Sequence, residues 1–181
     1  MLLPIISIVA CGRALRGFGR DRRGSAAVEF AIIAPVFFAL IFAIIETAMV
    51  FFAGQVLETA VQDSGRTFFT STVVSKSDYE TAICNRVKVL MDCTKLRNDV
   101  QTYAAGTAFT ISDPIDASGN FVDSFSYNAP ASTDTTSTVV VRSFYQWPLF
   151  VTGLGYNIAN INRGGTSQSR LLTATAAFRP Q

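Results

Sequence analysis

The sequence of 181 residues has no histidine and few charged residues, 15% of the total. Histidine is the commonest general base and the commonest metal ligand, so its absence removes the usual parts of hydrolytic and metal-dependent chemistry. No S-x-x-K spacing is present, and the glycine pairs lack the lysine of a phosphate-binding loop. We therefore expect neither an enzyme nor a cofactor, a metal site or a small-molecule substrate.

Charge is scarce and unevenly placed. Residues 1–24 contain five arginines and one aspartate, a net charge of +4, whereas the remaining residues contain 10 basic and 12 acidic side chains, a net charge of −2. A basic segment beside an apolar run stays in the cytoplasm, because lysine and arginine resist translocation. The basic cluster therefore indicates topology and not nucleic-acid binding, and the acidic remainder is expected outside.

A long apolar run follows the basic segment. Residues 26–45 contain one charged side chain, Glu29, in a stretch long enough for a helix to cross about 30 Å of hydrocarbon. A cleavable Sec or twin-arginine signal is the alternative, but it would have a shorter apolar core. Pro35 removes one helical hydrogen bond and is expected to kink or open the helix. We predict a transmembrane helix.

Two acidic residues bracket this run, Glu29 and Glu46. Their separation corresponds to about 26 Å of helix, so each is expected near one membrane interface. They point about 260° apart around the helix and cannot form one paired-carboxylate site.

Beyond Glu46 the apolar pattern narrows to a stripe with helical spacing. Its members are Ala53, Val56, Leu57, Ala60, Val61, Ser64 and Phe68, and the opposite, polar face carries Gln55, Glu58, Gln62, Asp63 and Arg66. Gly54 and Gly65 are expected to weaken the helix. The membrane helix is thus predicted to continue as an amphipathic helix ending near Phe69.

Three cysteines are present: Cys11 in the basic segment and the close pair Cys84 and Cys93. If the distal part is exported, its compartment is oxidising and the pair can form a disulfide that closes a short loop. Two buried free thiols are the alternative. A closed zinc site is excluded, because two cysteines without histidine supply too few ligands.

The remaining residues predict a small mixed domain. Residues 78–91 are typical of a short helix, with Ser77 or Asp78 as its N-cap and an apolar face formed by Ala82, Ile83, Val87, Leu90 and Met91. Short strands are then expected at 95–103, 108–112, 121–127, 138–146 and 171–178, separated by turn residues. The fold class is α+β: a long N-terminal helix with a small antiparallel sheet. Residues 138–146 are apolar on both faces, as in a central strand with the helix on one side.

Four aromatic residues lie close together at Phe144, Tyr145, Trp147 and Phe150. They could form a ligand or sugar platform, but packing in the core and at a strand end is the favoured interpretation.

The run RRGSAAVEFAIIAPVFFALIFAIIETAMVFFAGQVLETAVQDSGR resembles the N-terminal region of the TadE/TadG-like family, the pseudopilins of tight-adherence (Flp-type) pili. Supporting segments are the Cys84 to Cys93 region, VVVRSFYQWPLF at 139–150 and the ending RLLTATAAFR. The run from Gly24 to Phe30 looks like the prepilin peptidase site G-x-x-x-x-E-F. An accidental glycine beside an ordinary anchor is the alternative.

The resemblance implies cleavage between Gly24 and Ser25 on the cytoplasmic face, with Glu29 as the fifth mature residue. A buried Glu29 would need a counter-charge in a filament, and the new α-amino group of a neighbouring subunit's Ser25 could supply it. The leader is long and begins with its own apolar stretch, which a downstream start codon or a membrane-associated leader would explain. The size of the chain points to a minor or assembly subunit, because major subunits of these pili are very short.

The expected organisation is a basic leader at 1–24, a membrane and amphipathic helix at 25–73, and an exported domain at 74–181. The expected partners are prepilin peptidase, other pilins and pseudopilins, the inner-membrane assembly platform and membrane lipid. The expected role is that of a minor pseudopilin needed for pilus assembly, adhesion or biofilm formation. The alternative is a permanently anchored, single-pass inner-membrane protein with a periplasmic binding domain.

Overall fold

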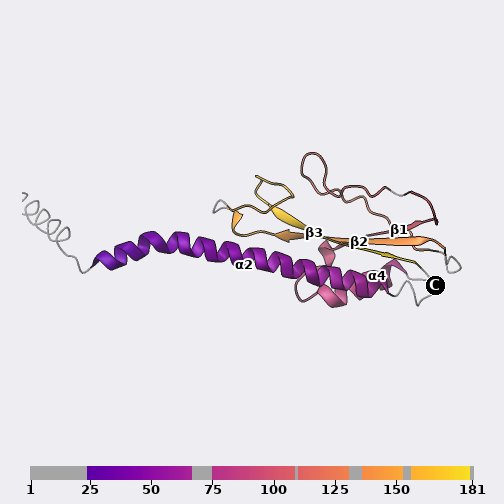
Figure 1. The fold of residues 1–181 in the computed structure, drawn as a ribbon, viewed down its shortest axis with the longest axis horizontal. Helices are drawn as coiled ribbons and strands as arrows, with labels where there is room; N and C mark the ends of the chain where they lie inside the picture. Colours follow the sequence, from indigo (N-terminus) through magenta and orange to yellow (C-terminus); the bar gives the residue numbers. More distant parts are fainter. Residues whose placement is uncertain (1–23, 67–74, 109, 131–135, 153–155, 180–181) are drawn as a thin grey trace, which may run out of the picture. The chain divides into compact units, whose positions relative to one another are not determined.

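The computed structural model describes residues 24–66, 75–108, 110–130, 136–152 and 156–179. The chain divides into two compact units, Met1–Phe42 and Ala43–Gln181. Cys11, Phe68, Phe69 and most of the predicted leader lie outside the described residues. The structure confirms the predicted class, a long apolar N-terminal helix followed by a small antiparallel sheet (Figure 1).

The long helix α2 spans Ser25–Gly65 and passes through Pro35 and Gly54 without a break. It ends earlier than the predicted Phe69, with a turn at Arg66. A methyl group on Gly65 would come within 2.0 Å of the Phe178 ring, so a larger residue at the helix end would force that ring to move.

The predicted amphipathic part of α2 is confirmed. Its buried residues, which recur at helical spacing, are Glu46, Val50, Ala53, Leu57, Ala60, Val61, Ser64 and Gly65. The predicted polar face, from Gln55 to Arg66, is exposed. One of its members, Asp63, pairs with Arg86 of the next helix at 3.3 Å.

The second helix, α4, spans Lys76–Val87. It begins before the predicted cap at Ser77 or Asp78, because Ser75 is the N-cap and its Oγ accepts from the backbone N–H of Asp78 at 3.1 Å. It also ends before the predicted Met91. The buried side chains Tyr79, Ile83 and Val87 fix the face that packs on the core.

The sheet contains β1 (Arg97–Tyr103), β2 (Thr138–Pro148) and β3 (Ser169–Phe178), all antiparallel, in the order β1-β2-β3. The short 3-10 helix η2 (Cys93–Lys95) precedes β1. Val141 lies opposite Val100 on one side and Ala176 on the other. The prediction of a central strand at 138–146 is therefore confirmed.

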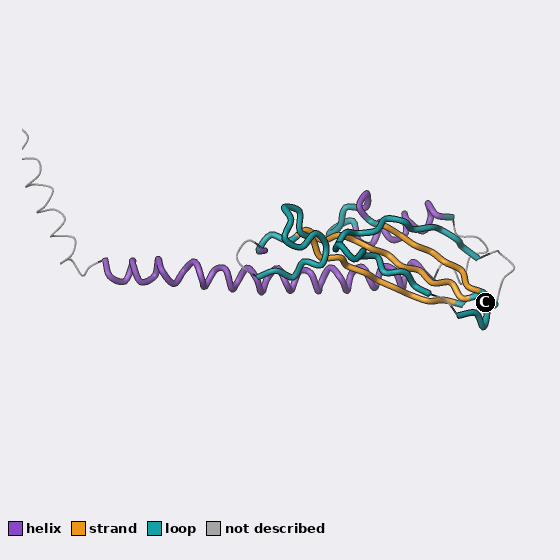
Figure 2. The backbone as a smooth tube through the Cα atoms, turned by 90° about the horizontal axis from the view of Figure 1, so that it is seen from above, coloured by secondary structure: helices purple, strands orange, loops and turns teal. Residues whose placement is uncertain are grey.

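Each face of the sheet is covered by a different layer (Figures 1 and 2). Val139, Val141 and Tyr145 of β2 pack with the second half of α2 and with α4 in the main core. On the other face, Phe144 packs with Ile161, Leu171 and aromatic residues of the long β1–β2 connection. Alternate side chains of β2 thus belong to two cores, which explains why both of its faces are apolar.

Two predicted strands are wrong. Residues 108–112 form no strand in their described part, and residues 121–127 form only isolated bridges at Phe121 and Tyr127. In the described part of the β1–β2 connection, backbone pairing with β1 is limited to Val100. Its N–H donates to Ser126 O at 2.9 Å, and its C=O accepts from Asn128 N–H at 2.7 Å. The apolar side chains that resembled a strand instead cover Phe144.

Candidate processing and assembly segment

The N-terminal end of α2 contains the predicted cleavage site. Ser25 is the first α-helical residue, and the exposed Gly24 directly precedes it. A methyl group on the Cα of Gly24 would meet no atom within 4 Å. A larger residue would therefore fit here in the folded chain, so the structure itself does not require glycine at this position.

Glu29 lies one helical turn after Ser25, and the Ser25 hydroxyl donates to Glu29 Oε1 at 3.1 Å. The carboxylate is exposed, and its partner is a neutral hydroxyl. Within the described ranges, the ion pairs involve other carboxylates than this one. A counter-charge from a neighbouring subunit therefore stays a prediction, and the position of Glu29 leaves it accessible to one.

The helix after Glu29 exposes large apolar side chains on all sides. Those exposed between Phe30 and Ile45 are Phe30, Ile32, Ile33, Val36, Phe37, Phe38, Leu40, Phe42, Ile44 and Ile45. Water would disfavour so much exposed apolar surface, whereas lipid accommodates it. Within the described residues, α2 is the one helix long and apolar enough to span a membrane.

Glu46, which is predicted to lie near the second membrane interface, is buried against a loop of the domain. Its side chain is buried, and its carboxylate accepts hydrogen bonds from the backbone N–H groups of Phe150 and Val151, the latter at 3.1 Å to Oε1. A carboxylate that accepts two backbone N–H groups compensates much of the cost of its burial. Sequence analysis missed these partners, because no local pattern near residue 150 indicates a carboxylate beside it.

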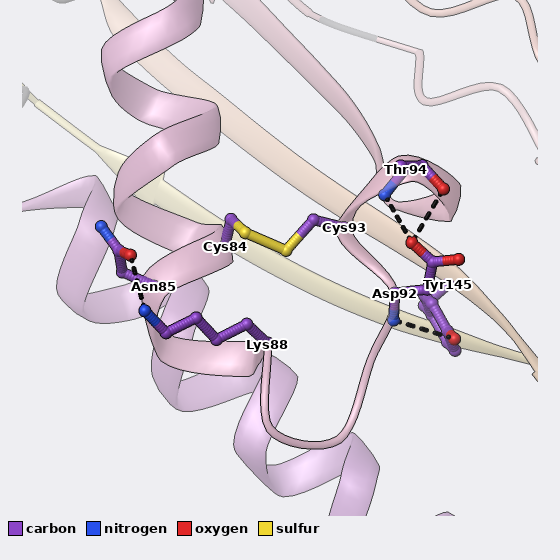
Figure 3. The surroundings of a disulfide bond; sticks show 7 residues. All are labelled: Cys84, Asn85, Lys88, Asp92, Cys93, Thr94 and Tyr145. Carbon is purple, nitrogen blue, oxygen red and sulfur yellow. Dashed lines mark hydrogen bonds between the residues drawn. A yellow bond between two sulfur atoms is a disulfide. The ribbon is translucent and has the colours of Figure 1, made fainter.

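The disulfide between Cys84 and Cys93 is present and joins α4 to η2, with the Cα atoms 5.5 Å apart (Figure 3). The alternative of two free thiols is therefore not supported. The neighbouring Asp92 is fixed at both ends: its N–H donates to Tyr145 Oη at 3.3 Å, and its Oδ1 accepts from Thr94 Oγ1 at 2.8 Å and Thr94 N at 3.0 Å. These bonds from Thr94 lower the pKa of Asp92. The bridge ties the last turn of α4 to η2, only nine residues further along the chain, and is therefore a local constraint.

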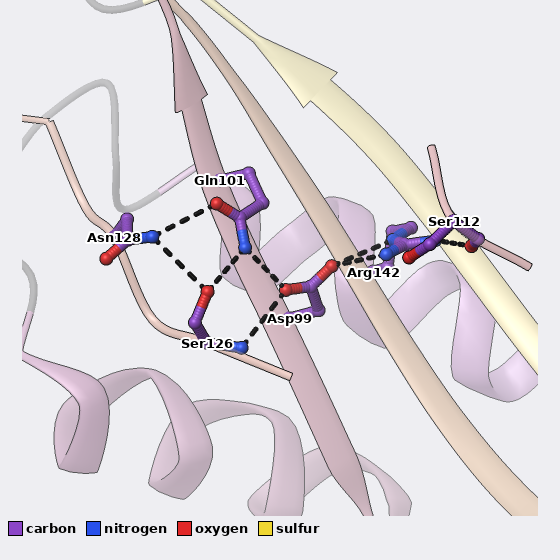
Figure 4. A network of polar contacts seen from close by, with 6 residues as sticks. All are labelled: Asp99, Gln101, Ser112, Ser126, Asn128 and Arg142. Carbon is purple, nitrogen blue, oxygen red and sulfur yellow. Dashed lines mark hydrogen bonds and ion pairs between the residues drawn. The ribbon is translucent and has the colours of Figure 1, made fainter. Parts of the chain in front are cut away.

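A buried ion pair lies on the sheet face opposite the helices. Arg142 Nη2 of β2 lies 2.6 Å from Asp99 Oδ2 of β1, and Arg142 Nη1 donates to Ser112 O at 2.8 Å (Figure 4). Asp99 Oδ1 accepts from Gln101 Nε2 at 2.9 Å and from the Ser126 N–H at 3.3 Å. The pair thus attaches the long β1–β2 connection to the sheet. All hydrogen-bond partners named here for the ion pair belong to the sheet or to the β1–β2 connection.

The four aromatic residues do not form one platform. Phe144 and Tyr145 are buried, and Phe144 stacks on Phe125 with the ring centroids 4.6 Å apart. Trp147 is half-buried beside Tyr145. These three confirm the packing interpretation. Phe150 contradicts it, because 82% of its surface is exposed.

A comparison with known protein families matches the segment that contains α2. Residues 24–66 match the family model described as TadE-like protein. The predicted resemblance is therefore confirmed over these residues, which begin at Gly24, contain Glu29 and extend to the turn that ends α2. No curated protein and no solved structure matches the chain.

Proposed function

We propose that this chain is a minor pseudopilin of a tight-adherence pilus, a structural subunit and not an enzyme. The observation that carries the proposal is the arrangement at the head of the TadE-like segment. There, an exposed glycine in a 3-10 turn directly precedes the first α-helical residue, a carboxylate follows one turn later, and an unbroken apolar helix begins.

The proposed topology places the leader in the cytoplasm, α2 across the inner membrane and the disulfide-bonded domain in the periplasm. The arginine cluster before α2 supports this orientation, because basic residues resist translocation. The Cys84–Cys93 bridge supports an oxidising compartment for the domain. Prepilin peptidase, other pilins and pseudopilins, and the inner-membrane assembly platform are the proposed partners.

After cleavage, Glu29 would enter a filament core with the apolar helix around it. A buried carboxylate needs a counter-charge, and the new α-amino group of Ser25 from a neighbouring subunit would supply it. In the single chain, Glu29 lies one helical turn after Ser25 and accepts from its hydroxyl, so the carboxylate is close to the chain end that cleavage would create. Adhesion and biofilm formation would follow from assembly.

Cleavage is tested in cells with Gly24→Val and its matched control Gly54→Val. An added Cβ at either glycine would meet no atom within 4 Å, so packing around the main chain does not require glycine at either position. Gly24→Val is expected to accumulate as the full-length precursor, and Gly54→Val is expected to be cut as the natural chain is. Equal processing of the two variants would overturn the proposed site.

The second candidate function is a permanently anchored envelope protein with a periplasmic binding domain. The size of the domain favours it, because the sheet and α4 lie outside the family match. This candidate predicts that the natural chain stays full-length when prepilin peptidase is present. It also predicts that Gly24→Val changes nothing.

A further inference from the structure

The exposed apolar surface of α2 does not stop where the folded domain begins. Met49, Phe51 and Phe52 remain exposed, although Val50 and Ala53 between and beside them are buried in the domain core. From Phe30 to Gly54, Glu46 is the one charged residue, and it is buried. The outer side of the helix therefore stays apolar for about 9 Å beyond Glu46, at 1.5 Å per residue.

A loop of the domain lies against these same two turns of the helix. The backbone N–H groups of Phe150 and Val151 donate to the Glu46 carboxylate. Tyr156 Oη lies 3.2 Å from Thr47 Oγ1. Two successive residues of α2 thus fix the level of the loop along the helix. Phe150 belongs to neither apolar core, and 82% of its surface is exposed. Tyr156 is 42% exposed.

We propose that Phe150 and Tyr156, together with Phe51 and Phe52, form an aromatic foot that inserts into the interfacial zone of the membrane and seats the domain on the bilayer. This inference rests on the membrane-anchored topology proposed above. The medium that surrounds Phe51 and Phe52 also surrounds Phe150, because Glu46 holds that residue at a level where the helix exposes apolar groups. Tyrosine is enriched at membrane–water interfaces, and phenylalanine is common on the apolar face of helices that lie in the interface.

Lipid fits this surface better than a protein partner does, because the polar groups at this level are already satisfied within the chain. Glu46 accepts from two backbone N–H groups, and Thr47 Oγ1 donates to Ala43 O at 2.8 Å. A protein interface would normally use such groups for hydrogen bonds across it. Lipid offers no partners at the hydrocarbon boundary and therefore requires internal satisfaction.

The foot is tested by tryptophan fluorescence of the full chain in phospholipid vesicles. Trp147 is the one natural tryptophan, so Trp147→Phe provides the background for Phe150→Trp. Val89→Trp provides the aqueous control, because Val89 is 88% exposed at the turn after α4. Phe38→Trp, within the apolar run, reports whether the helix itself is inserted. If the background is unstable, Phe150→Trp is read as a difference spectrum against the natural chain.

Tryptophan at position 150 is expected to emit at shorter wavelength than at position 89. It should be quenched by lipids brominated near the headgroup end of their chains and shielded from aqueous acrylamide, at every protein-to-lipid ratio. Emission like that of position 89, or shielding only at high protein-to-lipid ratio, would overturn the inference, since the latter means that a second copy covers the foot. Absence of lipid quenching at position 38 would instead contradict the proposed membrane topology.

Discussion

The carboxylate of Glu46 on α2 accepts a hydrogen bond from the backbone N–H of Phe150, 104 residues further along the chain. The same carboxylate also accepts from Val151. One acidic side chain at the end of the apolar run therefore joins the helix to the loop that follows the central strand. The acidic residue that the sequence placed near a membrane interface is thus also an internal clamp of the domain.

Replacing Glu46 by alanine is expected to destabilise the domain by about 2 kcal/mol, because it leaves backbone N–H groups without their acceptor. Glu46→Gln should cost less, since its amide oxygen still accepts one bond. The measurement is chemical unfolding of the full chain in detergent micelles, followed by far-ultraviolet circular dichroism. Glu58→Ala, on the exposed face of the same helix, is the matched control and should change stability by less than about 0.5 kcal/mol. Equal effects at both positions would contradict the clamp.

The ion pair between Arg142 and Asp99 predicts a different pattern of stability. Its side chains are only 9% and 3% exposed, so Arg142→Met leaves a buried charge without its partner and should cost about 3–5 kcal/mol. The double variant Asp99→Asn/Arg142→Met removes that charge and should recover part of the loss. The same unfolding measurement compares the two variants. A double variant no more stable than Arg142→Met would mean that the unpaired charge is not the source of the cost.

Alkaline pH is expected to weaken the domain through two tyrosines. Burial, and after it the carboxylates of Asp78 and Glu80, raise the pKa of Tyr127 from 10.0 to about 12, and burial also raises the pKa of Tyr79. A phenol whose pKa is raised in the folded state stabilises fully below the unfolded pKa, and this contribution is lost as the pH rises through the folded value.

Tyr127→Phe should therefore lose less stability than the natural chain between about pH 10 and 12. The check is the free energy of unfolding measured across this range. A decline of the same steepness in both chains would show that Tyr127 does not contribute.

Glu29 is expected to act in assembly and not in cleavage. Glu29→Ala should be processed as the natural chain is, but its incorporation into pili should fall by at least about tenfold, because the buried α-amino group of a neighbour would lose its partner. Immunoblots of sheared pili and of membranes measure the two steps. The control is Glu58→Ala, whose exposed carboxylate contacts Gln62 at 3.4 Å. Unchanged incorporation of Glu29→Ala would remove the counter-charge role.

The elements with strong periodicity could be predicted from the sequence, and the contacts between distant residues could not. Helical spacing indicated the buried stripe of α2, and apolar residues on both faces indicated β2 as a central strand. Residues 121–127 misled the prediction, because Phe121 and Phe125 are apolar in order to cover Phe144 and not to form a strand. The partners of Glu46 and Asp99 depend on tertiary packing, for which the sequence contains no local pattern.

In the candidate site too, local motifs could be predicted from the sequence and contacts between distant residues could not. Gly24, Ser25 and Glu29 lie within six residues, so their motif was visible before the structure, and the family match covers them. Cys84 and Cys93 were also recognisable as a pair by their spacing and compartment, and the structure joins them. The exposed Phe150 was assigned to packing, because the sequence could not show that the loop is anchored by its backbone while its ring stays outside.

The most direct test of the proposed function is the N-terminus of the protein in its native cell, determined by mass spectrometry of membrane and sheared-pilus fractions. A pseudopilin cut by prepilin peptidase gives a chain that begins at Ser25 in both fractions. In a strain without the peptidase, the chain keeps its leader and is missing from the pilus fraction. A stable full-length chain in cells that contain the peptidase would contradict the proposal.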